Sequence, residues 1–189
     1  MSVPSVPKTD EEIVGEAFVR KDAFGVLVER YQAPLSRYIR RLGILRREDV
    51  EDVLQNVFLK AYRNLNGFDR DLKFSTWIYR IAHNEAMSFF GSRSVRPEGY
   101  VIDDGEHVLD GLRSSLDVAY GAERALNSTQ LSRALSSLEP KYRDVLVLRY
   151  FEEREYADIS DILQIPMGTV ATLLNRAKKR LQKLLPPQP

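Results

Sequence analysis

The chain has 189 residues and nearly balanced charge, with 28 basic and 27 acidic side chains and a net charge of +1. It contains no cysteine and only two histidines, which excludes disulfides, thiolate zinc sites and cysteine nucleophiles and argues against a histidine-rich metal site. No apolar run approaches the roughly 20 residues that cross a bilayer, and residues 1–10 lack the apolar centre of a signal peptide, so we expect a cytoplasmic protein without metal or cofactor.

Helical periodicity dominates the first half of the chain, and no convincing strand pattern occurs. Thr9 and Glu12 have the spacing of a capping box, which predicts the start of a first helix. Apolar residues then recur at helical spacing over residues 24–42. Pro34 is expected to kink or interrupt this second helix, and Gly43 to close it.

A clearly amphipathic helix is expected over residues 49–65. Its apolar positions form one stripe, whereas charged and amide side chains form the opposite face. Such a face is usually only solvated, but a partner of complementary charge could dock on it. Asn66 and Gly67 end this helix, and Ser75 is the expected N-cap of the next one.

Residues 74–84 are the most informative segment, because they bring aromatic, cationic and amide side chains to one short stretch of helix. An exposed aromatic ring can hold an unstacked base at about 1–3 kcal/mol per base. Arg80 and Asn84 can bind base edges or phosphates. Trp77 is at core spacing, so part of the cluster is ordinary packing, and we expect Phe74 and Tyr79 to be the exposed rings.

Catalysis has little support in the sequence. The chain has no Gly-rich phosphate loop, no Ser/His/Asp arrangement and no paired carboxylates on a pocket-forming element. We interpret His83 as a structural or groove-facing polar residue rather than a metal ligand. The chain is therefore not expected to be an enzyme.

The composition changes after the aromatic segment. Residues 91–121 hold five of the ten glycines, and acidic residues outnumber basic ones by seven to four over residues 91–128. This pattern predicts a flexible acidic linker at residues 91–128 between two helical domains, at residues 10–90 and 129–185.

The second domain ends in a predicted helix-turn-helix. A short helix is followed by a turn at residues 165–168 and by a helix for which Thr169 is the expected N-cap. Residues 168–185 hold five basic side chains and no acidic one, so this helix can neutralise phosphates in the major groove. Thr172 and Asn175 lie on the same face and could reach bases. A plain helical hairpin with a solvated basic face is the alternative.

Taken together, these motifs resemble bacterial sigma factors of the extracytoplasmic-function class, group IV of the sigma-70 family, which keep only the second and fourth sigma domains. The matching segments follow the family's order and spacing and are residues 24–31, 49–62, 74–84, 138–143 and 165–170. The resemblance implies an all-α fold with a sigma region 2-like domain and a sigma region 4-like helix-turn-helix domain.

The resemblance also implies a sigma subunit that binds core RNA polymerase and directs promoter-specific transcription initiation. Its first domain would bind the clamp helices of the largest polymerase subunit, and the flap region is a further contact. The polymerase-binding residues that it implies are Arg40, Asp49, Asp52, Gln55, Asn56, Leu59 and Lys60. Those implied for melting and reading the −10 element are Lys73, Phe74, Ser75, Thr76, Trp77, Tyr79, Arg80, His83 and Asn84. Those implied for the −35 element are Thr169, Thr172, Asn175, Arg176, Lys178 and Lys179.

Members of this family are usually held by an anti-sigma factor, so the resemblance implies such a partner. It also implies that the free protein is a monomer and does not insert into membranes. The chain departs from the family pattern at four positions. Ser88 and Gly91 stand where the family often has Asp and Arg, and Ala171 and Leu173 stand where it typically has basic residues. The −35 interaction is therefore expected to be weak or unusual.

Two other functions remain open at this point. An autonomous helix-turn-helix regulator would bind duplex operators through residues 129–189 without core polymerase, usually as a dimer. A decayed sigma-like protein would bind polymerase or an anti-sigma factor without starting transcription.

Overall fold

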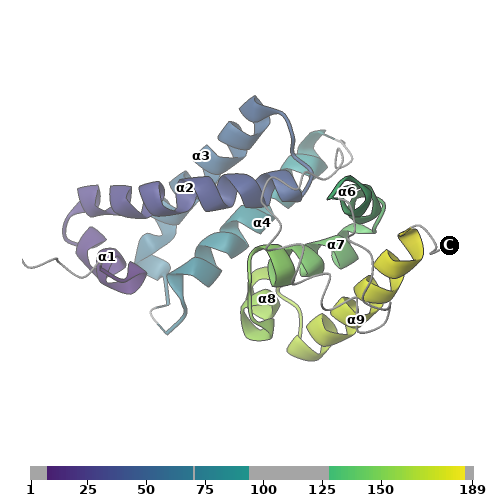
Figure 1. Ribbon diagram of the computed structural model, residues 1–189. Helices are drawn as coiled ribbons and strands as arrows, with labels where there is room; N and C mark the ends of the chain where they lie inside the picture. Colours follow the sequence, from purple (N-terminus) through teal and green to yellow (C-terminus); the bar gives the residue numbers. More distant parts are fainter. Residues whose placement is uncertain (1–7, 70, 94–127, 186–189) are drawn as a thin grey trace, which may run out of the picture.

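The computed structural model describes residues 8–69, 71–93 and 128–185, and every regular element within these ranges is helical (Figure 1). The predicted linker falls almost entirely on residues 94–127, which lie outside the described residues. In the described part of the chain, no helix combines the length and apolar character needed to cross a membrane. The expected all-α fold with two helical domains is confirmed.

The first domain contains α1 (Asp10–Ala17), α2 (Phe24–Arg41), α3 (Arg47–Asn64) and α4 (Phe74–Arg93), with short 3-10 turns η1 (Lys21–Ala23) and η2 (Leu65–Gly67). The predicted capping box is present, since the Thr9 side chain accepts from the Glu12 N–H and the Glu12 carboxylate accepts from the Thr9 N–H. Gly43 follows α2 at a φ of 107°, a left-handed conformation that a glycine adopts without strain.

Helix α2 continues through Pro34, so the expected interruption is wrong. A proline removes one backbone donor from a helix. Here Tyr31, Leu35 and Tyr38 are buried on both sides of it, and this packing keeps the turns on either side helical.

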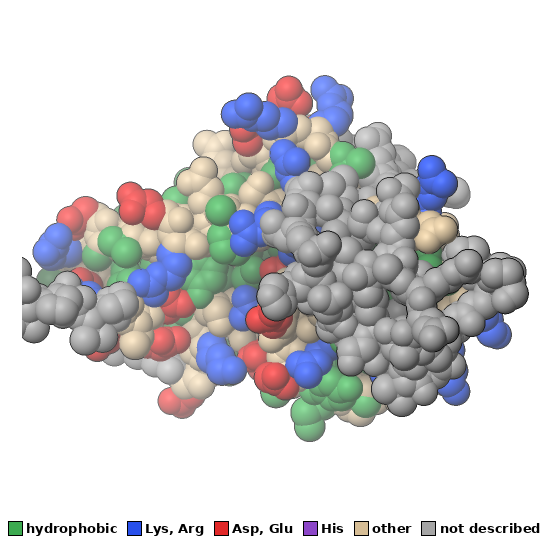
Figure 2. Space-filling view, viewed as in Figure 1, with side chains coloured by type: hydrophobic (Ala, Val, Ile, Leu, Met, Phe, Trp, Pro, Cys, Tyr) green, Lys and Arg blue, Asp and Glu red, His purple; other side chains and the backbone are tan. Residues whose placement is uncertain are grey.

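Helix α3 packs its apolar stripe against α2 and α4. The stripe is buried as expected, with Val53, Val57 and Ala61 at most 3% exposed. The opposite face is exposed to solvent. Acidic and basic side chains are interspersed over the visible part of this domain, in line with the near-zero net charge (Figure 2).

The second domain contains α6 (Ser128–Ser136), α7 (Pro140–Leu146), a π-helical turn η3 (Val147–Phe151), α8 (Tyr156–Leu163) and α9 (Met167–Leu184). Pro140 occupies the first turn of α7, where its missing N–H costs nothing. The continuous run 142–148 is buried, which makes α7 and η3 the centre of the domain.

Helix α9 begins three residues earlier than predicted. Its N-cap is Pro166, and Thr169 lies within the first turn, so the expectation of a Thr169 cap is wrong. The preceding helix ends at Gln164, whose left-handed backbone (φ 54°) reverses the chain. Because the helix has already begun at Met167, the Thr169 hydroxyl does not lie at the N-cap position.

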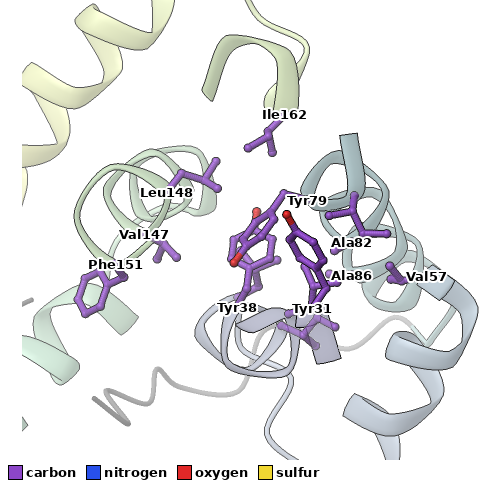
Figure 3. Packing of buried hydrophobic residues seen from close by; sticks show 14 of the residues in the cluster. Tyr31, Tyr38, Val57, Tyr79, Ala82, Ala86, Val147, Leu148, Phe151 and Ile162 are labelled. Carbon is purple, nitrogen blue, oxygen red and sulfur yellow. The ribbon is translucent and has the colours of Figure 1, made fainter. Parts of the chain in front are cut away.

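The two domains lie against each other, with α8 packed along α4 (Figure 1). Figure 3 shows Tyr79 of α4 between Tyr38 of α2 and the apolar side chains Leu148 and Ile162 of the second domain. The buried side chains of both domains form one continuous cluster. This contact positions the surfaces considered next.

Candidate nucleic-acid interface

The aromatic residues of α4 are buried, and the expectation that Phe74 and Tyr79 are exposed is wrong. Phe74 is fully buried, and its ring centroid lies 5.5 Å from that of Tyr31 and 5.8 Å from that of Phe68, both edge-on. Trp77 is 7% exposed and packs against both Phe68 and Phe74. These rings close the end of the first domain and, as packed, offer no free face to a base.

The start of α4 is held by α1 rather than by the expected N-cap. The helix begins at Phe74, so Ser75 lies inside it and the prediction of a Ser75 cap is wrong. The Phe74 N–H donates to the Glu11 carboxylate at 3.3 Å. A carboxylate from a distant helix thus satisfies one of the free N–H groups of this terminus.

The exposed polar groups of this region lie at its two ends. Lys73 and Asn84 are exposed, and Ser75 and Arg80 are half-buried. We call these four accessible polar residues the α4 row; Lys73, Arg80 and Asn84 share one side of the helix, and Ser75 lies on another. With the second domain packed along α4, these four residues are the accessible ones among the residues expected to bind the −10 strand.

His83 is a buried structural residue. It is 9% exposed, and its Nδ1 lies 3.1 Å from the Tyr38 hydroxyl. Burial, with a smaller effect from the positive charge of Arg143, lowers the pKa of His83 to about 4. Within the described ranges, no group of three or more His, Asp or Glu side chains is placed to hold a metal ion.

Three polar side chains at the start of α4 or just before it contact the second domain, which the sequence did not indicate. The Thr76 hydroxyl donates to Asp158 of α8 at 2.8 Å, and the Lys73 ammonium lies 3.3 Å from the same carboxylate. The Tyr79 hydroxyl donates to Glu152 at 2.7 Å. An acid in a polar helix looks solvated in sequence, so no local signal identifies these pairings.

The polar face of α3 forms a second surface, together with the end of α2. Leu59 and Tyr62 are 43% and 39% exposed, so this charged face also carries two accessible apolar side chains three positions apart. Asp49 is buried, Arg40 is half-buried, and Lys60 donates to Glu85 of α4. The other expected members of this face are exposed, namely Asp52, Gln55, Asn56 and Lys60.

Helix α9 presents the third surface. Its exposed expected residues are Thr169, Thr172, Asn175, Arg176 and Lys179, while Lys178 is half-buried. The Thr172 hydroxyl donates to the Gly168 carbonyl at 2.9 Å. Leu173 packs against the apolar core, so at this position the chain has a packing residue instead of a cation.

Comparisons with known proteins match both halves of the chain. The family model Sigma-70 region 2 matches residues 27–96, and the family model Sigma-70, region 4 matches residues 128–181. The ECF RNA polymerase sigma factor SigW of Bacillus subtilis is 37% identical over 173 residues, which cover 87% of this chain and 90% of that protein.

Solved structures of similar fold include CnrH in complex with the cytosolic domain of CnrY. It has a TM-score of 0.67 and 25% identity, and the match covers 94% of this chain and 97% of that one. The sigma factor RpoE of Bartonella quintana, in complex with the anti-sigma factor NepR, has a TM-score of 0.64 and 20% identity over 86% of this chain and 96% of that one. The second likeness concerns the fold alone.

Proposed function

The chain belongs to the sigma-70 family as an extracytoplasmic-function sigma factor, and on this premise we propose how its surfaces carry out that role. It binds core RNA polymerase and directs promoter-specific transcription initiation. The observation that carries this conclusion is the match to SigW, at 37% identity, which spans both regions in one alignment. An autonomous operator-binding regulator is not favoured, because it would need only the second region.

The α3 face is our proposed polymerase-binding surface. Asp52, Gln55, Asn56 and Lys60 surround the exposed Leu59, and an apolar residue ringed by polar ones is typical of an interface centre. The partner would be the clamp helices of the largest subunit, with the flap region as a contact of the second domain. We assign Asp49 and Arg40 a supporting position, since neither is fully exposed.

The α4 row is our proposed site for the −10 strand. Lys73 and Arg80 supply cations for phosphates, and Asn84 and Ser75 supply hydrogen-bonding groups for base edges. We assign the buried Phe74, Trp77 and His83 the task of holding α4 in place. Binding alone accounts for this role, so we expect no chemistry of the chain's own.

Helix α9 is our proposed reader of the −35 element. Asn175, Thr172 and Thr169 can reach base edges in the major groove, while Arg176, Lys178 and Lys179 can bind phosphates. The partners we propose are core polymerase, promoter DNA and an anti-sigma factor that holds the free monomer. Since core polymerase works on chromosomal DNA, we propose a cytoplasmic location.

A run-off transcription assay with purified core polymerase and host promoter fragments tests this function. Asn84→Ala removes an exposed amide from the α4 row and is expected to lower promoter-specific transcription about tenfold, the effect of one lost base contact. Gln130→Ala removes an exposed amide from α6 and is the matched control, expected to transcribe as the parent does. Specific transcripts that survive Asn84→Ala undiminished would contradict the assignment of the α4 row.

Ala171→Lys is expected to strengthen binding of a −35 duplex about threefold, because a cation near the start of α9 adds one phosphate contact. Ala171 is half-buried beside the exposed Thr172, so a lysine there can extend its ammonium to solvent. Titrations at two salt concentrations check this, since the added contact should steepen the salt dependence. Equal affinity of parent and variant at both concentrations would count against this docking of α9.

A further inference from the structure

The start of α9 carries no charge, although its later turns are basic. Residues 167–175 contain no charged side chain, and the first cation of the helix is Arg176. Met167, the first residue of α9, is 56% exposed. A single exposed apolar side chain is ordinary on a protein surface. This one lies at the end of the helix to which we assign the −35 element, so its chemistry affects what that end recognises.

Thr172 adds a second apolar group to this end of the helix. The residue is exposed, and its hydroxyl donates to the Gly168 carbonyl one turn earlier, at 2.9 Å. A hydroxyl has a single proton to donate, so while this bond is kept Thr172 does not donate to a base. What the side chain still offers to an acceptor-only base edge is its methyl group.

The neighbouring positions supply neither a cation nor an obstruction. Ala171 is half-buried, and Leu173 packs against the apolar core. Gly168 is exposed, and a Cβ atom built on it would meet open space, so a base edge can approach the helix here. Figure 1 shows the first turns of α9 beside α8, at the edge of the second domain.

We propose that Met167, together with the methyl group of Thr172, reads thymine methyl groups in the −35 element. In the major groove, thymine presents a C5-methyl group, which apolar side chains contact, whereas Arg and Lys pair with guanine. A recognition helix enters this groove with its N-terminal residues toward the bases. This inference rests on the proposed function of α9 and adds to it a preference for thymine. Thr169 and Asn175 keep the polar contacts assigned above.

An apolar contact of this kind responds differently to base chemistry and to salt than a phosphate contact does. Uracil keeps the O4 acceptor of thymine and pairs in the same way, but it lacks the C5-methyl group. Replacing thymine by uracil is therefore expected to weaken binding about fourfold, the usual effect of one buried methyl group. Because the contact neutralises no charge, this factor should be the same at low and at high salt.

The experiment uses the holoenzyme, assembled from core polymerase and the full chain, on a promoter fragment that the parent transcribes specifically. Thymines of both strands of the −35 element are replaced by uracil one at a time. The holoenzyme concentration that gives half-maximal run-off transcription is then measured at two salt concentrations. The parent is expected to need about fourfold more holoenzyme for at least one of these replacements. A −35 element without such a position would overturn the proposal.

Variants of the two residues then test which side chain makes the contact. Met167→Ala is expected to transcribe the thymine and uracil fragments alike, with about the affinity that the parent has for uracil. Met167→Leu keeps a large apolar side chain and should retain the preference for thymine. Thr172→Ser removes the methyl group but keeps the hydroxyl that bonds to Gly168, and it should reduce the preference. Undiminished preference in Met167→Ala would overturn the assignment of Met167.

Leu184→Ala is the matched control for Met167→Ala. Leu184 is also apolar and 46% exposed, and it is the last residue of α9, about 25 Å along the helix axis from Met167. Its preference for thymine over uracil should equal that of the parent, and an equal loss in both variants would contradict a contact at the start of α9. Circular dichroism confirms that each protein is folded.

Failure of this inference is distinguishable from failure of the proposed function. If the parent gives no specific transcripts from any promoter fragment, the proposed function fails, and the inference fails with it. If the parent transcribes specifically but does not distinguish thymine from uracil at any position of the −35 element, the inference alone fails.

Discussion

Phe74→Ala is expected to lower the free energy of unfolding by about 3–5 kcal/mol, the usual cost of removing a buried phenyl ring. Phe74 is fully buried and contacts the rings of Tyr31, Phe68 and Trp77, which come from α2, the loop before α4, and α4 itself. A cavity at this point cannot collapse without moving three aromatic side chains. The only tryptophan of the chain lies beside it, so urea titration followed by fluorescence measures the change directly.

This result bears on how transcription defects of aromatic variants are understood. Loss of transcription in Phe74→Ala would follow from loss of the folded first domain, whereas Phe74→Leu should retain most of the stability and most of the transcription. A Phe74→Ala protein with unchanged stability and lost promoter melting would contradict the burial of this ring and favour base stacking.

The second large expected effect concerns the pH dependence of the free energy of unfolding. Two buried groups, His83 and Asp144, contribute to it with opposite signs, so their contributions cancel in the parent protein. Burial lowers the pKa of His83 from 6.5 to about 4 and raises the pKa of Asp144 from 3.8 to about 6. Between these values the native pair holds one proton, on Asp144. The unfolded pair also holds one, on the histidine. Proton uptake on unfolding is therefore close to zero for the pair, and the pair adds little pH dependence to stability.

Replacing either residue is expected to leave the pH dependence that the other one contributes to the free energy of unfolding. In Asp144→Asn, the native state binds fewer protons than the unfolded state, so the free energy of unfolding falls as the pH drops from 6.5 to 4. In His83→Asn, the native state binds more protons, so this free energy rises as the pH drops from 6 to 3.8. Each change is expected to reach about 3 kcal/mol relative to the parent, from a shift of roughly two pKa units.

Urea titrations across this pH range measure how the free energy of unfolding of each variant changes with pH. Subtracting the values for the parent removes the contributions of the carboxylates that all three proteins share. Asparagine at position 83 can keep the hydrogen bond to the Tyr38 hydroxyl, so the variant changes titration more than packing. Two variants that follow the parent's pH profile would show that His83 and Asp144 titrate as they do in the unfolded chain.

Local patterns were sufficient for much of the fold. The capping box at Thr9, the buried stripe of α3 and the exposed polar face opposite it depend on residues three or four positions apart. Side chains at this spacing meet on the same face of any helix, wherever the helix lies. The basic face of α9 was predictable for the same reason.

Tertiary contacts decided what α4 can expose. Phe74 is buried because Tyr31 and Phe68 close over it, and its N–H is bound by Glu11, which lies 63 positions earlier in the chain. Thr76 is buried by Asp158, which lies 82 positions later.

The sequence by itself therefore determined the family, the all-α class and the helices with a clear periodicity. Only the tertiary structure decided which aromatic and polar residues of the segment 73–84, our proposed −10 site, are accessible in the free protein. The physical reason is that helical periodicity specifies a face but not its partner. Burial and ion pairing depend on side chains brought from distant positions by the packing of whole helices.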